Sequence, residues 1–534
     1  MCGITGIIGQ NFDHRHLDTM MQRIAHRGPD AQGKWTNGAV SFGHLRLSII
    51  DLSDRATQPM HCARSGNLVI FNGEIYNYLE LRAELSEHYL FRTDSDTEVL
   101  LAAYLCWGID FLKRLRGMFG FALYDAGRQA VLLARDRFGI KPLYYRQTGG
   151  AVLFSSEIKG LLALPGLYHS VHLNKVFGFL AYRHLDTDEE TFFREVKQLP
   201  QASYVWATEN GQMTRPVEYW QVPTPGERPF EMKDREIFRD RLTESVRLHL
   251  RSDVPVASFL SGGLDSSSIA CLALQLLGKD YGLQTYSSVL EEKTEENTLI
   301  AVMQAHLEGA VHHGVTFDGS NFLKALPRIT YHHDEPLADA SMYVHWELCK
   351  LASQHGVKVM LSGNGGDEVL GGYASYIYAL LGRFLQNGNL AALIRYALTF
   401  SQNRPESFAW LLLRSAQEAM PYSVRERVKK AQSAPARRLM AGFLPADEYI
   451  FYPHRNKDPY TANFFNNLRS WTVPPFLHYE DRNSMAFGVE IRVPMLDHDF
   501  FEFVTSFRPE DLLRGRSKQV LRQSLHGIVP AEVL

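Results

Sequence analysis

The chain has 534 residues, which at roughly 150 residues per domain permits about three domains and disfavours one compact core. Apolar residues make up 45% and charged residues 22%, a composition that excludes wholesale disorder. Because 56 Lys and Arg residues face 59 Asp and Glu residues, the net charge is −3, and no global positive field favours nucleic acid or an anionic membrane as a partner.

Targeting patterns and cysteines both favour a cytoplasmic protein. The sequence has no run of about 18 apolar residues, and its start lacks the basic region, apolar run and cleavage site of a secretory signal. Five cysteines without a CxxC pair predict reduced thiols instead of a metal site or a redox dithiol. Four of them lie in apolar or mixed surroundings that predict buried, inert thiols: Cys62, Cys106, Cys271 and Cys349.

The first 200 residues read as short apolar strands broken by Gly, Asn and Asp, with a few amphipathic helices. This mixture predicts an α+β domain in which helices cover sheets. Strands are expected at 40–47, 68–72, 119–124 and 131–134, and helices at 79–87 and 97–107. Three prolines and a glycine within 222–230 predict an extended, poorly packing linker. We place the linker at 223–232, between domains of residues 1–222 and 233–534.

Helices and strands alternate after the linker, which predicts a parallel sheet with helices on both faces, an α/β arrangement. The helices are expected at 235–250, 266–277 and 343–355, and the strands at 254–260, 283–289 and 357–361. Residues 374 to about 470 read as almost purely helical. Within 381–440, ten Lys or Arg residues accompany three Asp or Glu residues, which we interpret as a solvated helical layer and not as a binding patch.

Cys2 is the first candidate for chemistry. Removal of Met1 would expose its α-amine, whose unperturbed pKa near 8 lets it act as a base beside the thiol. Residues 3–9, GITGIIG, read as a glycine-punctuated strand that would hold this end of the chain in a sheet. A terminus fixed in this way can be aimed at a substrate, although a cysteine at position two is by itself a weak signal.

Several polar turns beside apolar strands accompany Cys2. They read RGPD at 27–30, RLSIID at 46–51, NGEIYN at 72–77, SDTE at 95–98, RDRFGIKPLY at 135–144 and SSEIK at 155–159. Turn chemistry alone accounts for each of them, but together with Cys2 they resemble the glutaminase domain of the class II glutamine amidotransferases. The resemblance spans about residues 2–200 and implies an N-terminal nucleophile hydrolase fold, a four-layer αββα sandwich.

By this resemblance, Cys2 attacks the side-chain amide of glutamine, while Asn72 and Gly73 donate hydrogen bonds to the oxyanion. A fixed oxyanion donor is worth about 3 kcal/mol, and a bidentate arginine suits a carboxylate. The residues implied to bind glutamine are Arg46 for the α-carboxylate, Asp96 for the α-amine, and Asn72 and Glu74.

A second candidate site lies between an expected strand and an expected helix. The loop there reads SGGLDSS at 261–267, so backbone N–H groups and a helix N-terminus would converge on an anion. It lacks the lysine of a GxxxxGK[ST] loop, which favours cleavage between the α- and β-phosphates of ATP. The loop resembles that of the ATP pyrophosphatases, which form acyl-adenylates and release pyrophosphate.

With LSGNGGDE at 361–368, RNSMA at 482–486 and SKQVLR at 517–522, the chain is similar to the glutamine-hydrolysing asparagine synthetases over nearly its whole length. Asp265 and Asp367 are candidate Mg²⁺ ligands, because a hard cation that bridges phosphates takes one or two carboxylates. The resemblance implies that Lys518 steadies the adenylate. The implied ATP contacts are Leu260, Ser261, Gly262, Gly263, Asp265, Ser266, Ser288, Ser362 and Gly363.

One position departs from the family pattern. Asn364 stands where asparagine synthetases often carry an acidic residue that is proposed to help deprotonate the incoming amine, and an amide cannot act as that base. Either another group takes the proton, with Asp334, Glu335 and Asp339 on a neighbouring loop as candidates, or the acceptor is not aspartate.

We therefore expect a two-site amidotransferase in which ammonia, released from glutamine, displaces AMP from a carboxylate activated by ATP and Mg²⁺. Aspartate is the leading acceptor, and another carboxylate, such as a sugar acid or a natural-product precursor, is the alternative. Two rivals are a binding module that has lost the chemistry and a ligase that uses an internal amine. The intact set of site residues disfavours the first, and Cys2 disfavours the second. No nucleic acid or membrane partner is expected, and a homodimer is left open.

Overall fold

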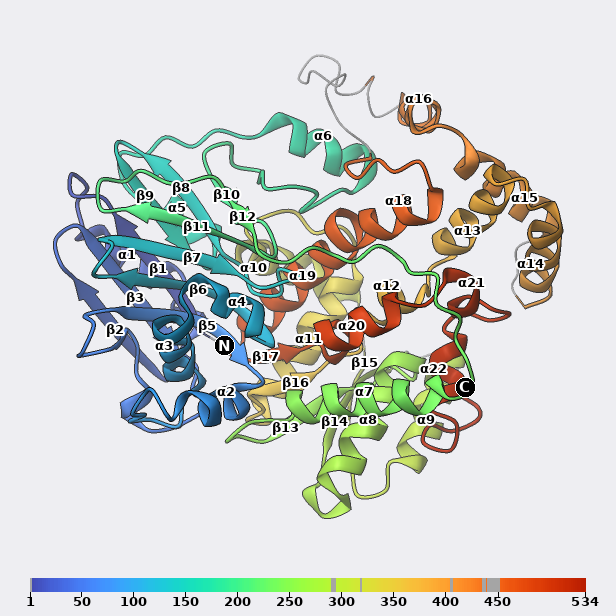
Figure 1. Cartoon of the computed structure of the whole chain (residues 1–534), viewed down its shortest axis with the longest axis horizontal. Helices are drawn as coiled ribbons and strands as arrows, with labels where there is room; N and C mark the ends of the chain where they lie inside the picture. The colour runs from blue at the N-terminus through green and yellow to red at the C-terminus, as the bar shows by residue number, and fades with distance from the viewer. Residues whose placement is uncertain (1, 290–293, 317–318, 404–406, 435–437, 439–451) are drawn as a thin grey trace.

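The computed structural model describes residues 2–289, 294–316, 319–403, 407–434, 438 and 452–534 (Figure 1). Two antiparallel sheets of six strands each form its N-terminal part. The first has the order β10 (Lys197–Gln198), β8 (Tyr144–Thr148), β9 (Ala151–Ser155), β1 (Gly3–Ile8), β3 (Val40–Arg46) and β2 (Ala31–Thr36). The second has the order β12 (Val217–Glu218), β11 (Ser203–Thr208), β7 (Ala130–Arg135), β6 (Gly117–Asp125), β5 (Leu68–Ile75) and β4 (Met60–His61).

Helices cover the outer faces of both sheets. The inner faces share one apolar layer, in which Ile4 and Phe42 of the first sheet pack with Ile70 and Leu133 of the second. Because side chains alternate along a strand, Ile7 points the other way, into the layer beneath α1 (His16–Arg23) and α5 (Ile158–Leu162). The outer face of the second sheet packs on α2 (Tyr78–Leu85), α3 (Asp96–Trp107) and α4 (Phe111–Arg114). The expected αββα sandwich is confirmed.

The C-terminal part contains a parallel sheet of five strands, as expected from its alternating pattern. The strand order is β15 (Val311–Thr316), β14 (Gln284–Val289), β13 (Val256–Phe259), β16 (Val359–Leu361) and β17 (Glu490–Arg492). Val359 and Leu361 lie in the layer that contains α7 (Asp234–His249) and α8 (Leu264–Leu277), whereas Met360 faces α11 (Ser341–Gln354). Helices therefore cover both faces of this sheet. Other helices around it are α9 (Glu295–His306), α10 (Phe322–His333) and α19 (Val473–Met485).

A helical layer occupies the right-hand side of the view in Figure 1. Its helices are α13 (Ala374–Gln386), α14 (Leu390–Asn403), α15 (Phe408–Ala419), α16 (Tyr422–Gln432) and α18 (Pro459–Asn466). The expected solvated basic face is only partly correct, because Arg425 is 8% exposed and pairs with Glu418 at 2.5 Å. Together with Arg414 and Lys429, these two residues line a cavity of about 380 Å³.

The segment 223–232 contains no helix or strand and none of its residues is buried, but it is attached to the C-terminal part at several points. The backbone N–H of Gly226 donates to the carbonyl of Thr505 at 2.8 Å, at the end of α20 (His498–Thr505). The ring of Phe230 lies 5.0 Å from that of Phe507, measured between centroids. This extended segment therefore crosses the surface of the C-terminal part as an attached strap, and it is not a free tether.

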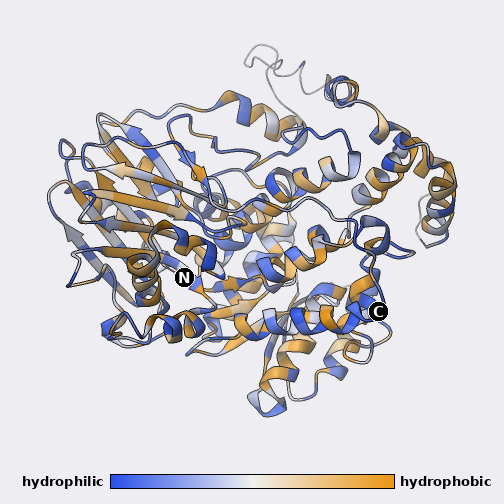
Figure 2. Ribbon diagram, in the orientation of Figure 1, coloured by the Kyte–Doolittle hydropathy of each residue, from blue (hydrophilic) through white to orange (hydrophobic). Residues whose placement is uncertain are grey.

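The two parts of the chain meet through a buried apolar interface. Phe138, which follows β7, packs against Phe501 of α20 with 5.1 Å between ring centroids and belongs to the same apolar cluster as Phe238 of α7. Beside it, Arg116 binds both carboxylate oxygens of Asp497 at 2.6 and 2.7 Å. In Figure 2 the apolar colour concentrates on the strands and on the inner faces of helices. The apolar core is therefore shared between the two parts.

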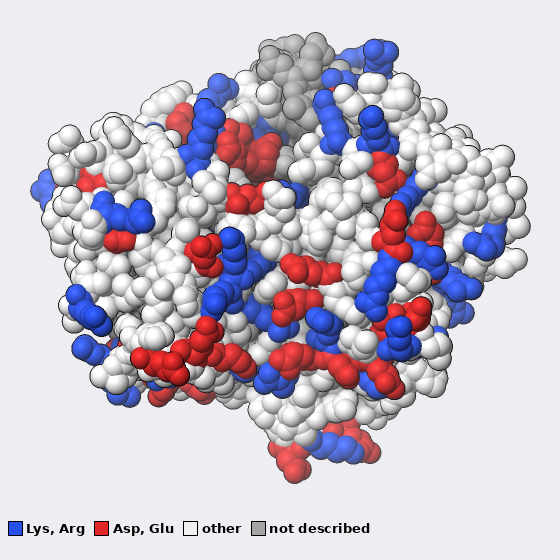
Figure 3. Space-filling view, viewed as in Figure 1, with Lys and Arg blue, Asp and Glu red and all other residues white. Residues whose placement is uncertain are grey.

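Charge is mixed at the surface, as the near-neutral composition predicts. The face in Figure 3 carries Lys and Arg side chains interspersed with Asp and Glu side chains. Within the described ranges, no helix is both long and apolar enough to cross a membrane. Cys62, Cys271 and Cys349 are buried as expected, but Cys106 is exposed, because it lies on the outward face of α3.

Replacing Phe138 by alanine is expected to lower the free energy of unfolding by about 3–5 kcal/mol, because the lost ring leaves a cavity at the interface. Urea denaturation followed by circular dichroism measures the change. Leu323→Ala is the control: its side chain is 72% exposed, so we expect a change within about 0.5 kcal/mol. Equal effects of the two substitutions would contradict a shared core around Phe138.

Candidate active sites

The first candidate site is built around Cys2, at the entry to β1. Pairing of β1 with β3 and β9 holds this end of the chain in the middle of a sheet. The backbone N–H of Cys2 donates to Asn72 Oδ1 at 3.0 Å, and its carbonyl accepts from Arg27 Nε at 3.1 Å. Burial raises the pKa of the Cys2 thiol. Met1 lies outside the described residues, so its removal stays a prediction.

The predicted glutamine-binding side chains lie around the same point. A small cavity is lined by Cys2, Arg46, Gly73, Glu74 and Asp96. Asn72, on β5 beside Gly73, presents a buried amide nitrogen that has no hydrogen-bond partner among the described residues. Such a nitrogen is a donor that remains available to an oxyanion.

Glycine at position 73 is required by a close backbone approach. A Cβ atom there would lie 2.0 Å from the carbonyl oxygen of Met118 on the neighbouring strand β6. Backbone φ at Gly73 is +158°, at the edge of the region that L side chains avoid. Any larger residue would therefore displace β5 from β6 beside the thiol.

Arg46 and Asp96 are both fixed by the backbone around them. Arg46 donates from Nη1 to the carbonyl of Ser53 at 2.8 Å and from Nη2 to the carbonyl of Asp51. Asp96, in the first turn of α3, accepts from the N–H of Ile75 at 2.9 Å. Burial raises the pKa of Asp96 to about 6, while that hydrogen bond opposes the rise. A cation and an anion are thus presented to the same small cavity.

Two residues of the C-terminal part reach this site, and the sequence analysis gave them no role. Arg492, on β17, is fully buried and lies 3.3 Å from Glu74 Oε1 and 2.6 Å from Glu490 Oε1. It also donates to the carbonyls of His249 and Arg251 at 2.8 and 2.6 Å. These two residues, Arg492 and Glu490, lie on a strand that follows the RNSMA segment, and this position was the one sign in the sequence that they could belong to a site. Only the fold brings that strand to Glu74.

Arg27 makes a second connection that sequence reasoning missed. Its guanidinium is fully buried and bonds Glu157 Oε1 at 2.8 Å and the two carboxylate oxygens of Asp481 at 2.8 and 3.1 Å. Burial opposes ionisation of Asp481, but the positive charge of Arg27 prevails and lowers the pKa of that carboxyl. Arg27 therefore joins the Cys2 backbone to α19, although RGPD read as a turn.

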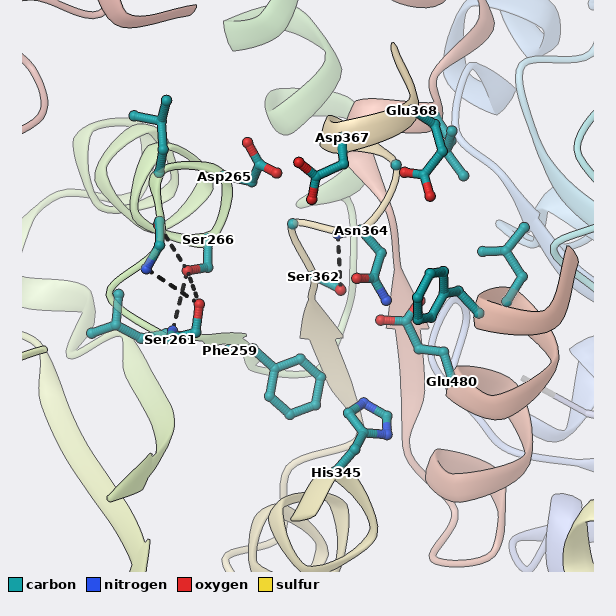
Figure 4. A pocket seen from close by; sticks show the side chains of 18 of the residues that line it. Phe259, Ser261, Asp265, Ser266, His345, Ser362, Asn364, Asp367, Glu368 and Glu480 are labelled. Atoms are coloured by element: carbon teal, nitrogen blue, oxygen red, sulfur yellow. Dashed lines mark hydrogen bonds between the residues drawn. The ribbon is translucent and has the colours of Figure 1, made fainter. Parts of the chain in front are cut away.

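The second candidate site is a cavity of about 560 Å³ at the carboxyl ends of β13 and β16 (Figure 4). In parallel sheets, ligands bind at this edge. The backbone N–H of Ser261 donates to Ser266 Oγ at 3.1 Å, and the hydroxyl oxygens of the two serines are hydrogen-bonded at 2.9 Å. The predicted residues that line the cavity are Leu260, Ser261, Gly263, Asp265, Ser266, Ser288, Ser362, Gly363, Asp367 and Lys518.

Gly262 is the predicted ATP contact that does not line this cavity. Its φ of +73° makes the turn between β13 and α8, and a Cβ atom there would lie 2.9 Å from the N–H nitrogen of Ile300. The structure therefore assigns Gly262 to the shape of the loop. Which residues of the SGGLDSS loop face the cavity depends on the direction in which the loop turns, and the sequence does not predict that direction.

Lys518 stands between the two candidate metal ligands. Its Nζ lies 2.5 Å from Asp265 Oδ2 and 2.6 Å from Asp367 Oδ1. Asp265 Oδ1 is buried and has no hydrogen-bond partner among the described residues. Two hard carboxylates with a free oxygen suit Mg²⁺, so the donor set fits that cation. Burial opposes protonation of Lys518, but the two carboxylates prevail and raise its pKa.

The neighbouring-loop acids, which the sequence analysis offered as replacement bases, lie elsewhere. Asp334 accepts from the N–H groups of Ile158 and Lys159 at 2.9 and 3.1 Å, and Glu335 accepts from that of Phe192 at 2.9 Å. Together with Asp339 they line a separate cavity, formed mainly by apolar side chains. The cavity at the carboxyl ends of β13 and β16 is instead lined by Asn364, Glu368 and Glu480.

Comparison with known proteins defines the class of protein first. A glutamine amidotransferase domain matches residues 1–220, and an asparagine synthase domain matches residues 237–534. Asparagine synthetase [glutamine-hydrolyzing] 1 of Bacillus subtilis is 33% identical over 100% of this chain and 85% of its own length. Asparagine synthetase [glutamine-hydrolyzing] 3 of the same organism is 31% identical over 100% of this chain and 86% of its own. Amidase chry2 of Gibberella zeae is 30% identical over 100% of this chain and 87% of its own length.

A domain for glutamine and a domain for amide synthesis in one chain define a glutamine-dependent amidotransferase. The chain belongs to the family of glutamine-hydrolysing asparagine synthetases. Enzymes of this family are ATP-dependent carbon–nitrogen ligases that take their amido group from glutamine.

Arg27→Met is expected to destabilise the protein by about 3–5 kcal/mol, because it removes the buried cation that lies nearest to Asp481 and leaves that carboxylate to Arg482, at 3.4 Å. Arg15→Met is the matched control, since the Arg15–Asp13 pair is exposed at 2.8 Å and such pairs contribute about 0–1 kcal/mol. Chemical denaturation of both variants measures the difference. If Arg27→Met cost no more than Arg15→Met, the bridge would not hold the two parts together.

Proposed function

We propose that the protein makes asparagine from aspartate, ATP and glutamine. One observation carries the proposal: the cavity at Cys2 and the cavity at the carboxyl ends of β13 and β16 occur in one folded unit and are joined by buried residues. Arg27 touches the Cys2 carbonyl on one side and Asp481 of α19 on the other, and α19 lines the second cavity. We also propose that residues 1–222 are the glutaminase domain, 223–232 the linker and 233–534 the synthetase domain.

In the proposed glutaminase half, the Cys2 thiol attacks the side-chain amide carbon of glutamine. The α-amine exposed by removal of Met1 takes the thiol proton and gives it to the leaving ammonia. Asn72 Nδ2 and the Gly73 N–H stabilise the oxyanion. Arg46 binds the α-carboxylate and Asp96 the α-amine. Water then hydrolyses the thioester to release glutamate.

In the proposed synthetase half, the SGGLDSS loop and the N-terminus of α8 bind the phosphates of ATP. The carboxylate of the acceptor attacks the α-phosphorus, and pyrophosphate leaves. Lys518 steadies the charge of the adenylate, which its position between two carboxylates supports. Asp265 and Asp367 would hold Mg²⁺, which supplies positive charge for the phosphate oxygens. Ammonia then attacks the acyl carbon and AMP leaves.

A second candidate function is the same chemistry on another carboxylate. Asn364, where an acidic residue is frequent in the family, favours this alternative, and so does the similarity to amidase chry2. A panel of carboxylic acids, including aspartate and sugar acids, separates the two. We expect glutamine-dependent formation of AMP and pyrophosphate with aspartate. Product formation with another acid and none with aspartate would assign the alternative.

Cys2→Ala is expected to abolish glutamine hydrolysis and glutamine-dependent synthesis, because the nucleophile is lost, while synthesis from added ammonia continues. Coupled detection of glutamate and pyrophosphate measures both activities. Cys62→Ala, at another buried cysteine, is the control and should retain both. Equal loss of the two activities in Cys2→Ala would contradict separable sites. Mass spectrometry of the intact protein tests removal of Met1.

The KM for glutamine is expected to rise as the pH falls through about 6, because burial raises the pKa of Asp96 to about 6. Below that pH the carboxyl is neutral and no longer attracts the α-amine of glutamine. Steady-state glutaminase assays from pH 5 to pH 8 measure this rise in KM, the acid limb of the pH profile. Asp96→Asn should show a high KM without the limb, and an unchanged limb in this variant would assign it to another group.

A further inference from the structure

The synthetase-side cavity, at the carboxyl ends of β13 and β16, contains two acids that the proposed mechanism does not use, Glu368 and Glu480. Glu480, on α19, projects into the cavity opposite the nucleotide loop, and Figure 4 shows its carboxylate facing the side chain of Asn364. The side chain is 4% exposed, and its Oε1 has no hydrogen-bond partner among the described residues. Burying a carboxylate oxygen without a hydrogen-bond partner costs free energy, so its presence in this cavity calls for an explanation.

The position of Glu480 on α19 places it on the wall nearest the glutaminase site. The next residue, Asp481, is bound by Arg27 at 2.8 and 3.1 Å, and Arg27 in turn donates to the carbonyl of Cys2. Glu480 and the Cys2 backbone are thus separated by one buried ion pair.

The surroundings of Glu480 suit a base that works at neutral pH. Burial raises the pKa of Glu480 to about 7, and the side chains of Ser362 and Asn364 and the charge of Lys141 limit the rise. A carboxylate with such a pKa is ionised in a large fraction of molecules at neutral pH and is a stronger base than an exposed glutamate.

The other acids of the cavity already have partners. Asp265 and Asp367 bind Lys518. Burial also raises the pKa of Glu368 to about 7, but its Oε1 accepts from the hydroxyl of Tyr373 at 2.9 Å. Glu480 differs in that its Oε1 has no hydrogen-bond partner in the described part of the chain, and no ion pair of this kind is formed by it there.

We propose that Glu480 is the general base of the amidation step and replaces the acidic side chain that Asn364 lacks. The inference rests on the proposed function, since it requires an acyl-adenylate in this cavity. Ammonia attacks the acyl carbon, so a C–N bond forms and the C–O bond to AMP breaks. AMP leaves with the electron pair of that bond, and a proton of the new ammonium group moves to the Glu480 carboxylate. Asn364 favours the charged form of the base.

The test measures ammonia-dependent synthesis across pH at a fixed concentration of uncharged ammonia, with the full chain. The wild-type rate should fall below about pH 7, where Glu480 becomes protonated. In Glu480→Gln we expect the rate to fall about 10²- to 10⁴-fold and the acid limb to disappear. Exchange between ATP and pyrophosphate, which reports adenylate formation and the folded state, should remain close to that of the wild type.

Glu368→Gln is the matched control, because Glu368 lines the same cavity and has a similarly raised pKa. This variant should keep the acid limb. The proposal is overturned if Glu480→Gln keeps wild-type amidation with its acid limb, or if Glu368→Gln alone removes that limb. It is also overturned if Glu480→Gln loses exchange and amidation equally, since Glu480 would then bind the acceptor. A wild-type protein that exchanges pyrophosphate with no acceptor would instead refute the proposed function.

Discussion

Arg27 is the buried cation on which the connection between the two sites depends. It neutralises Glu157 of the N-terminal part and Asp481 of α19, and it holds the backbone of Cys2. Removal of this cation would leave two buried carboxylates with fewer positive neighbours, which is costly. The same side chain therefore contacts the backbone at the thiol and the helix that lines the second cavity.

The shared core gives this arrangement its rigidity. Phe138 and Phe238 belong to one apolar cluster although they come from different halves of the chain, and Arg492 reaches from β17 to Glu74, which lines the cavity at Cys2. A displacement of β17 would move Arg492 and, through its neighbour β16, the loop with Asn364. The two cavities can therefore influence one another without a large domain motion, because a packed interior transmits small shifts.

The sequence predicted most of the fold because its patterns are local. Short apolar strands such as 68–72 and the alternation of helices and strands after residue 233 identified both sheet types, and polar motifs at strand ends identified the residues now found around each cavity. The contacts between halves were not predictable in this way. Arg27 lies in a segment that read as a turn, the segment of Glu480 received no role, and 454 positions separate Arg27 from its partner Asp481 on α19. Similarly, Glu335 was expected on a loop that neighbours the second site, but its carboxylate accepts a hydrogen bond from the N–H of Phe192 in the N-terminal part.

The strap at 223–232 has a consequence for how this architecture can be divided. Because Gly226 and Phe230 are seated on the C-terminal part, cleavage in this segment would leave two fragments that still adhere, and separate expression of either half would expose an apolar surface meant for the other. Chimeras that exchange the ammonia-producing half between relatives would thus have to exchange its complementary surface as well.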